Sequence, residues 1–151
     1  MKKLIETFYT GLRDLDADKM VSCYHKDVVF EDPAFGKLEG DRAKNMWRML
    51  CQNAKNFKVE FSEVEANDQS GSAHWEAWYT FSKTGRPVHN RIDAQFEFKN
   101  GQIIKHTDHF NLHRWASQAM GWKGQLLGGT GFFQKKMMQQ TNQMLDKFIA
   151  N

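Results

Sequence analysis

The stretch "AQFEFKNGQII", residues 94–104, decides how the second half of the chain folds. Ala94, Phe96 and Phe98 alternate with polar residues, which is the pattern of a strand with one buried face. Asn100-Gly101 then supplies the two left-handed positions that a tight hairpin turn requires. A strand must therefore run back antiparallel beside the first, and we expect its apolar positions to be Ile104, Phe110 and Leu112.

The same alternation extends back from this hairpin to Phe57. Residues 67–72 and Thr84-Gly85 read as turns that separate further strands. We expect the inward positions of these strands to be Phe57, Val59, Phe61, Trp75, Ala77, Tyr79, Phe81, Val88 and Ile92. Consecutive hairpins give an antiparallel meander, so the sequence predicts an α+β domain in which this meander packs on helices.

Before Phe57 the apolar residues repeat at helical spacing. Residues 4–15 form one amphipathic helix, Asp16 or Asp18 caps a short second helix, and Gly40-Asp41 opens a third. Beyond the meander we expect a short helix over residues 112–120, a glycine-rich loop "LLGGTG" over residues 126–131, and a long helix over residues 132–150.

Composition narrows the functional classes. The chain has 151 residues, 40% hydrophobic and 26% charged, which fits one globular domain. The net charge of +3 is spread along the chain, so no nucleic-acid partner is expected. No apolar run is long enough to cross a membrane, so no membrane partner is expected either. The first fifteen residues carry several charges, so they are not expected to be a signal peptide. Cys23 and Cys51 read as free thiols, with one disulfide as the alternative. Both features predict a cytoplasmic protein.

A strand "VVFEDP", residues 28–33, lies between the second and third helices. Val28, Val29 and Phe30 favour a half-buried strand, and Pro33 ends it because proline cannot donate a ladder hydrogen bond. Asp32 therefore lies where the strand stops. Two interpretations remain open: Asp32 caps a surface turn, or it lies at the rim of a pocket.

The stretch "YHKDVVFEDPAFGKLEG", residues 24–40, following two short helices, resembles the nuclear transport factor 2-like superfamily, and more narrowly its SnoaL-like and ketosteroid-isomerase-like members. The resemblance covers roughly residues 3–115. It implies a cone-shaped curved antiparallel sheet wrapped around the N-terminal helices, with a C-terminal helical extension. We therefore expect a domain over residues 1–115, an extension over 116–151 packed on it, and a homodimer through the outer sheet face.

The same resemblance implies a role for Asp32, which falls where the steroid isomerases carry their general base. The tyrosine of their oxyanion hole aligns with Phe8, which has no hydroxyl group. Their second donor, an aspartate, aligns with Asp93 or Ala94, depending on the register. The Asn100-Gly101 turn favours Ala94 and leaves Asp93 on a polar outer face. Without either donor, steroid-type isomerisation is not favoured.

The stretch "IIKHTDHFNLHRW", residues 103–115, carries a second acid. Asp108 matches a catalytic aspartate of the SnoaL cyclases and of the limonene-epoxide hydrolases. The Arg-x-Asp pair of those hydrolases falls on Trp75 and Ala77, so their triad is not reproduced. A shift of that strand by one residue would bring His74 and Glu76 to those positions instead.

Together these residues predict a site at the open end of the cone. We expect Asp32 and Asp108 to act as base and acid, and His106 to relay or orient the proton. The expected ligand-contacting residues are aromatic: Phe8, Tyr9, Trp47, Trp75, Tyr79 and Phe110. The alternative is that Asp32 only caps a turn while His106 and Asp108 bond to backbone. His109 alternates to the other face, so no metal site is expected, and no cofactor.

Three functional classes are compatible with this pattern. The first is a cofactor-free isomerase, cyclase, dehydratase or epoxide hydrolase acting on a small hydrophobic molecule. The second is a module that binds such a molecule without chemistry. The third is a protein-interaction domain that uses the sheet face or the Met-rich tail around Met137 and Met144.

Overall fold

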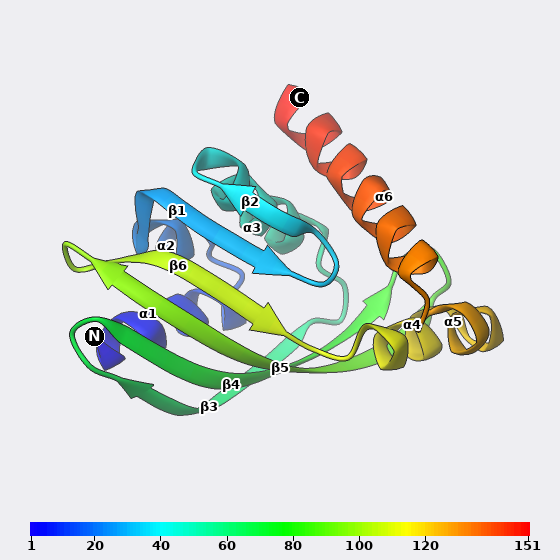
Figure 1. The fold of residues 1–151 in the computed structure, drawn as a ribbon, viewed down its shortest axis with the longest axis horizontal. Helices are drawn as coiled ribbons and strands as arrows, with labels where there is room; N and C mark the ends of the chain where they lie inside the picture. Colours follow the sequence, from blue (N-terminus) through cyan, green and yellow to red (C-terminus); the bar gives the residue numbers. More distant parts are fainter.

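A computed structural model describes all 151 residues. The chain forms one six-stranded sheet with helices on its concave side (Figure 1). The strands lie in the order β2-β1-β6-β5-β4-β3. Their bounds are β1 Tyr24–Asp32, β2 Gly36–Glu39, β3 Lys58–Ala66, β4 Ser70–Phe81, β5 Arg86–Lys99 and β6 Gln102–His109. The helices are α1 Lys2–Arg13, α2 Ala17–Ser22, α3 Asp41–Asn53, α4 Leu112–Met120, α5 Trp122–Leu127 and α6 Gly131–Ala150.

Strands β3 to β6 form the predicted antiparallel meander. Asn100 and Gly101 have φ angles of 52° and 75°, so the hairpin between β5 and β6 turns as the sequence indicates. Ala94 is 1% exposed and Asp93 lies on the other face of β5. The register that places Ala94 toward the core is therefore confirmed.

Strand β1 joins the sheet through a parallel pairing with β6, so the sheet is mixed rather than wholly antiparallel. Phe30 lies opposite His106 and Glu31 opposite Thr107. The short strand β2 pairs antiparallel with β1 and forms the edge of the sheet. The parallel pair brings a segment from the start of the chain beside the last strand.

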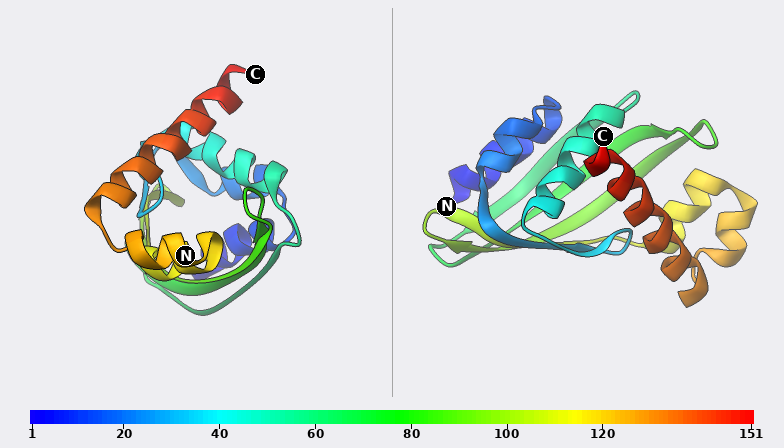
Figure 2. Two further views of the ribbon diagram at one scale, coloured as in Figure 1. Left: turned by 90° about the vertical axis from the view of Figure 1, so that its right-hand side faces the viewer. Right: turned by 90° about the horizontal axis from the view of Figure 1, so that it is seen from above.

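The sheet curves around α1, which gives the expected cone (Figure 2). Ile5, Phe8 and Leu12 of α1 are fully or almost fully buried, because residues three to four apart share one face of a helix. The carboxylate of Asp16 accepts a hydrogen bond from the Lys19 amide at 3.0 Å and caps α2, which settles the choice between Asp16 and Asp18.

Three sequence expectations need correction near the end of the meander. Strand β6 stops at His109, and Leu112 begins α4 instead of ending a strand. Ile103, not Ile104, is the fully buried isoleucine, because the β5–β6 register shifts between Glu97 and Phe98. The expected loop over residues 126–131 is shorter, since its two leucines belong to α5.

The C-terminal helices lie at the open end of the cone and across α3 (Figure 2). Leu145 of α6 is fully buried in the main core. Arg42 of α3 contacts Asp146 at 2.6 Å and the Asn142 side chain at 2.8 Å. The expected boundary between residues 115 and 116 falls inside α4. None of the helices is both long and apolar enough to span a membrane.

Candidate functional site

Strands β1 and β6 bring Asp32, His106 and Asp108 to the concave face of the sheet. Phe30 lies opposite His106, and the next inward positions along the two parallel strands are Asp32 and Asp108. Side chains two residues apart point to the same face, and neighbouring strands lie about 4.8 Å apart. The two acids are therefore neighbours across the parallel pair, which sequence alone could not place.

A buried chain of hydrogen bonds runs through His106. Trp47 Nε1 donates to Tyr24 Oη at 2.8 Å, and Tyr24 Oη lies 2.7 Å from His106 Nδ1. His106 Nε2 lies 2.9 Å from Asp108 Oδ1, which also accepts a bond from Trp75 Nε1 at 3.4 Å.

The donors in this chain fix its direction. An indole nitrogen can only donate, so Tyr24 Oη accepts from Trp47 and has its own hydrogen free for His106 Nδ1. His106 is then the tautomer with hydrogen on Nε2, and it donates to Asp108. The alternative in which His106 and Asp108 bond only to backbone is wrong, because both bond to side chains.

Aromatic rings enclose His106, whose exposure is 0%. Its imidazole stacks on Trp47 at 6.0 Å between ring centroids and contacts Phe8, Phe30 and Phe96 at 5.3, 5.1 and 4.4 Å. A ligand cannot reach this ring without displacing the core. The polar contacts of His106 are therefore with Tyr24 and Asp108 alone.

Asp32 caps the turn, which is one of the two roles that the sequence left open; its place at the rim of a pocket stays a prediction. Its Oδ1 atom accepts hydrogen bonds from the amides of Ala34 at 2.9 Å and Phe35 at 2.7 Å, which caps the turn at Pro33. Burial raises the pKa of Asp32 to about 7; the Phe35 amide opposes this shift and the charge of Asp108 adds to it. A carboxyl group with this pKa exchanges protons near neutral pH.

Asp108 keeps one oxygen available. Both of its hydrogen bonds go to Oδ1, and the structure gives Oδ2 no protein partner. Oδ2 is not fully buried, although the residue as a whole is only 3% exposed. Oδ2 is therefore the atom of this network that has no protein hydrogen bond and keeps a small accessible surface.

Three of the predicted aromatic residues keep some surface open, and two of them, Trp75 and Tyr79, lie near the acids. Trp75 is 8% exposed, and Tyr79 and Phe110 are half-buried. Tyr79 Oη accepts a hydrogen bond from Trp115 Nε1 at 2.6 Å. Burial raises the pKa of Tyr79, and the nearby charge of Asp32 raises it further.

The other three predicted aromatic residues are fully buried. Phe8 and Trp47 pack against His106 and hold it in place. Tyr9 stacks on Phe61, and its Oη is the one fully buried side-chain polar atom without a hydrogen-bond partner. Burial raises the pKa of Tyr9 well above its usual 10, with a smaller contribution from the charge of Asp108.

Sequence reasoning missed Tyr24 and Trp115. Tyr24 reads as an apolar position of the second helix, whereas it begins β1 and carries the hydroxyl that bonds to His106. Trp115 lies on the α4 face that covers the end of the meander. The signal for Tyr24 was its even spacing from Val28 and Phe30, the buried positions of the same strand.

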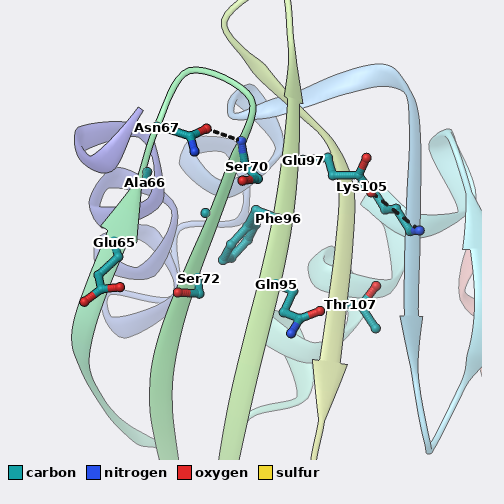
Figure 3. A pocket seen from close by; sticks show the side chains of 11 residues that line it. Glu65, Ala66, Asn67, Ser70, Ser72, Gln95, Phe96, Glu97, Lys105 and Thr107 are labelled. Atoms are coloured by element: carbon teal, nitrogen blue, oxygen red, sulfur yellow. Dashed lines mark hydrogen bonds and ion pairs between the residues drawn. The ribbon is translucent and has the colours of Figure 1, made fainter.

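The outer face of the sheet carries a separate set of polar residues. An open groove of about 620 Å³ there is lined by side chains that include Ser72, Gln95, Glu97, Lys105 and Thr107 (Figure 3). Thr107 alternates with His106 and Asp108, so this groove lies on the opposite side of β6 from the candidate site.

His74, Glu76 and Asp93 also lie on the outer face. His74 contacts Asp93 at 2.8 Å and Glu76 at 2.9 Å, and His89 contacts Glu76 at 2.6 Å. The hydrogen bond to Asp93 is the largest cause of the raised pKa of His74. Trp75 and Ala77 are the inward residues of this strand, so the register that would have moved His74 and Glu76 inside is excluded.

Solved structures with the same fold have low sequence identity to this chain. An LEH-like epoxide hydrolase from M. tuberculosis is 21% identical, covers 83% of this chain and 89% of its own, and has a TM-score of 0.63. A proposed polyketide cyclase from Xanthomonas campestris pv. campestris is 20% identical, with coverages of 77% and 93% and a TM-score of 0.64.

A protein with a ketosteroid isomerase-like fold from Catenulispora acidiphila, in complex with trimethylamine, is 10% identical; coverages are 77% and 91% and the TM-score is 0.67. A search of curated protein sequences finds no significant match. Residues 5–106, more than half of the chain, match the SnoaL-like domain family. The chain therefore belongs to the SnoaL-like proteins, within the nuclear transport factor 2-like superfamily.

Proposed function

We propose that this SnoaL-like protein is a cofactor-free acid–base enzyme that acts on a small, neutral, largely apolar molecule. The observation that carries the proposal is the pair of neighbouring carboxyl groups on β1 and β6, one of which has its pKa raised to about 7. Two acids whose environments separate their proton affinities can serve as donor and acceptor in one reaction.

The hydrogen bonds favour Asp108 as the base and Asp32 as the acid. Asp108 accepts bonds from His106 and Trp75, and its free Oδ2 is proposed to take a proton from the ligand or from a water molecule. Asp32, protonated in part at neutral pH, is proposed to give a proton to a ligand oxygen. This reverses the roles expected from the sequence, where Asp32 was the base.

The proposed ligand contacts follow from exposure. Trp75, Tyr79 and Phe110 offer apolar surface beside the acids and favour a planar or terpene-like molecule over a sugar or a phosphate. Tyr9, in contrast, is fully buried and its hydroxyl has no partner, so it is not proposed as a ligand contact. Phe8, Trp47 and His106 support the site from behind.

The second candidate function is ligand binding without chemistry. Phe8 and Ala94 occupy the positions where the resembled isomerases have oxyanion donors, and neither side chain can stabilise a developing negative charge. A homodimer through the outer face of the sheet, and a cytoplasmic location, remain part of the proposal under either function.

The test compares binding and turnover in the same variants. The probes are neutral terpene epoxides and aromatic polyketide esters, chosen because solved structures of similar fold are described as an epoxide hydrolase and a polyketide cyclase. Binding is followed by tryptophan fluorescence and turnover by mass spectrometry.

Asp32→Asn and Asp108→Asn should each lower turnover at least about a hundredfold while changing affinity only a few-fold. Asp93→Asn, on the outer face, is the matched control and should leave turnover unchanged. Binding without turnover in the natural protein would favour the second function, and full turnover in both inner variants would refute the first.

A further inference from the structure

One corner of the molecule exposes large apolar side chains. Trp122 is 68% exposed, Leu126 69%, Leu127 53% and Phe132 74%. We call these four residues the apolar corner. They lie on α5 and at the start of α6, and α5 lies beyond the ends of the strands (Figure 1). Trp122 and Leu126 are four residues apart and so share one face of α5. Apolar side chains gathered and exposed in this way mark an interaction surface.

The surroundings of the apolar corner are basic. The sequence has no acidic residue between Glu76 and Asp93, and none between Asp108 and Asp146. The two acid-free segments meet at α4, where Arg86 Nε donates to the Gln118 carbonyl at 2.8 Å. Their exposed cations are Lys83, Arg86, Arg91, Arg114, Lys123, Lys135 and Lys136, of which Arg91 pairs with Glu76.

Cations and apolar side chains alternate within the corner itself. Lys123 Nζ lies 5.8 Å from the centre of the Trp122 ring. Lys135 and Lys136 follow Phe132 by three and four residues, so they share its face of α6. Aromatic and aliphatic tips flanked by lysines are typical of segments that lie in a membrane interface, where lysine stems bury and their charges stay in water.

We propose that the apolar corner docks on an anionic lipid surface, with its apolar side chains in the headgroup region and its lysines against lipid phosphates. A second copy of the chain fits less well. A symmetric contact would place the same basic residues of both copies against each other, and like charges repel. The expectation of no membrane partner considered only spanning segments, and this inference revises it. It does not depend on the acid–base chemistry.

The experiment is flotation of the full-length protein with lipid vesicles. The vesicles are phosphatidylcholine alone and phosphatidylcholine mixed with phosphatidylserine. We expect binding to the mixed vesicles at least about tenfold stronger than to the neutral ones, weakening as salt is added. The triple variant Trp122→Ser, Leu126→Ser, Phe132→Ser should lose binding at least about tenfold.

Two further variants make the result specific. Lys123→Gln and Lys136→Gln should each weaken binding about fivefold, following the usual contribution of one lysine near an anionic surface. The control Leu50→Ser, Ile149→Ser removes apolar side chains that are 39% and 45% exposed but lie outside the corner, and it should bind as the natural protein does.

Three outcomes would overturn the proposal. The first is that the natural protein does not bind mixed vesicles. The second is that the triple variant, shown to be folded by circular dichroism, binds them as well as the control does. The third is that the triple variant changes the sedimentation coefficient from dimer to monomer without changing flotation, which would assign the corner to a second copy.

Discussion

At the scale of single residues, two tyrosines of nearly equal burial differ in whether their hydroxyl groups have hydrogen-bond partners. Tyr24 is 1% exposed and its hydroxyl bonds to both Trp47 and His106. Tyr9 is 0% exposed and its hydroxyl has no partner. Removing a buried hydroxyl that is hydrogen-bonded leaves its partners unsatisfied, whereas removing a buried hydroxyl without partners leaves no group unsatisfied. The same substitution should therefore have different effects at the two positions.

We expect Tyr24→Phe to lower the free energy of unfolding by about 2 kcal/mol, because the Trp47 indole and His106 Nδ1 each lose a partner. Tyr9→Phe is the matched control and should be neutral or slightly stabilising. Urea denaturation monitored by circular dichroism measures both. Equal losses in the two variants would mean that the Tyr24 hydroxyl does not hold the network.

Asp32 should make stability depend on pH. Its pKa in the folded protein is about 7, above the roughly 3.9 of an unfolded chain. The folded state therefore binds more protons than the unfolded state between these values, so stability falls as the pH rises through this window. The slope contributed by Asp32 is at most about 1.4 kcal/mol per pH unit.

The variant Asp32→Asn keeps the oxygen that caps the turn but cannot ionise. We expect urea denaturation to show a stability difference between variant and natural protein that grows in favour of the variant from about pH 4 to about pH 7 and then stays constant. Asp68→Asn, at an exposed residue without an ion pair, controls for loss of a surface charge. A difference that is independent of pH would contradict the raised pKa of Asp32.

At the scale of elements, α6 contributes one fully buried side chain to the main core, in addition to its polar contacts with Arg42. Leu145 has 0% exposure and lies in the main core, whereas the adjacent Met144 is 44% exposed. We expect Leu145→Ala to lower the free energy of unfolding by about 3 kcal/mol, and Met144→Ala by less than about 0.5 kcal/mol. Chemical denaturation should give one transition for both; a separate early transition for α6 would mean that it folds independently.

Elements with a strong local pattern could be predicted from the sequence. The alternation of Ala94, Phe96 and Phe98 before Asn100-Gly101 fixed both the hairpin and the inward face of β5. The register shift beside Phe98 could not be predicted, because a bulge leaves no regular period, and so Ile104 was chosen in place of Ile103. Helix α5 was missed because its last two residues, Leu126 and Leu127, read as the start of the glycine-rich loop.

The candidate site was predictable only in part. Asp32, His106 and Asp108 were selected individually by strand alternation and by the family resemblance, and the structure brings them to one face of the sheet. Their connection through Tyr24 depends on which strands are neighbours, and the parallel pairing of β1 with β6 joins segments far apart in the chain. No local pattern in either strand encodes that choice of partner.

At the scale of the whole molecule, the outer sheet face should join two copies. Its groove is lined by side chains of both charges, including Glu97 and Lys105, which allows the face to pair with itself. We expect sedimentation equilibrium to show a dimer at micromolar concentration. Gln95→Lys with Thr107→Lys would add like charges on both sides and should weaken the dimer at least about tenfold.

The control for the dimer test is Lys2→Gln with Lys147→Gln, which changes exposed charges on α1 and α6, away from the outer sheet face. It should sediment as the natural protein does. A monomer at all micromolar concentrations would refute the dimer.

The parallel pair of β1 and β6 also has a consequence for the order of folding. Tyr24 pairs with Ile103, so β1 must wait until β6 has been synthesised, whereas the hairpin of β5 and β6 closes locally. We therefore expect the two acids to meet after the main folding barrier, so that the burial of Asp32, with the added charge of Asp108, affects the unfolding rate more than the folding rate. In stopped-flow experiments the unfolding rate should increase from about pH 4 to about pH 7 and then level off, while the refolding rate stays nearly constant, and Asp32→Asn should remove that increase.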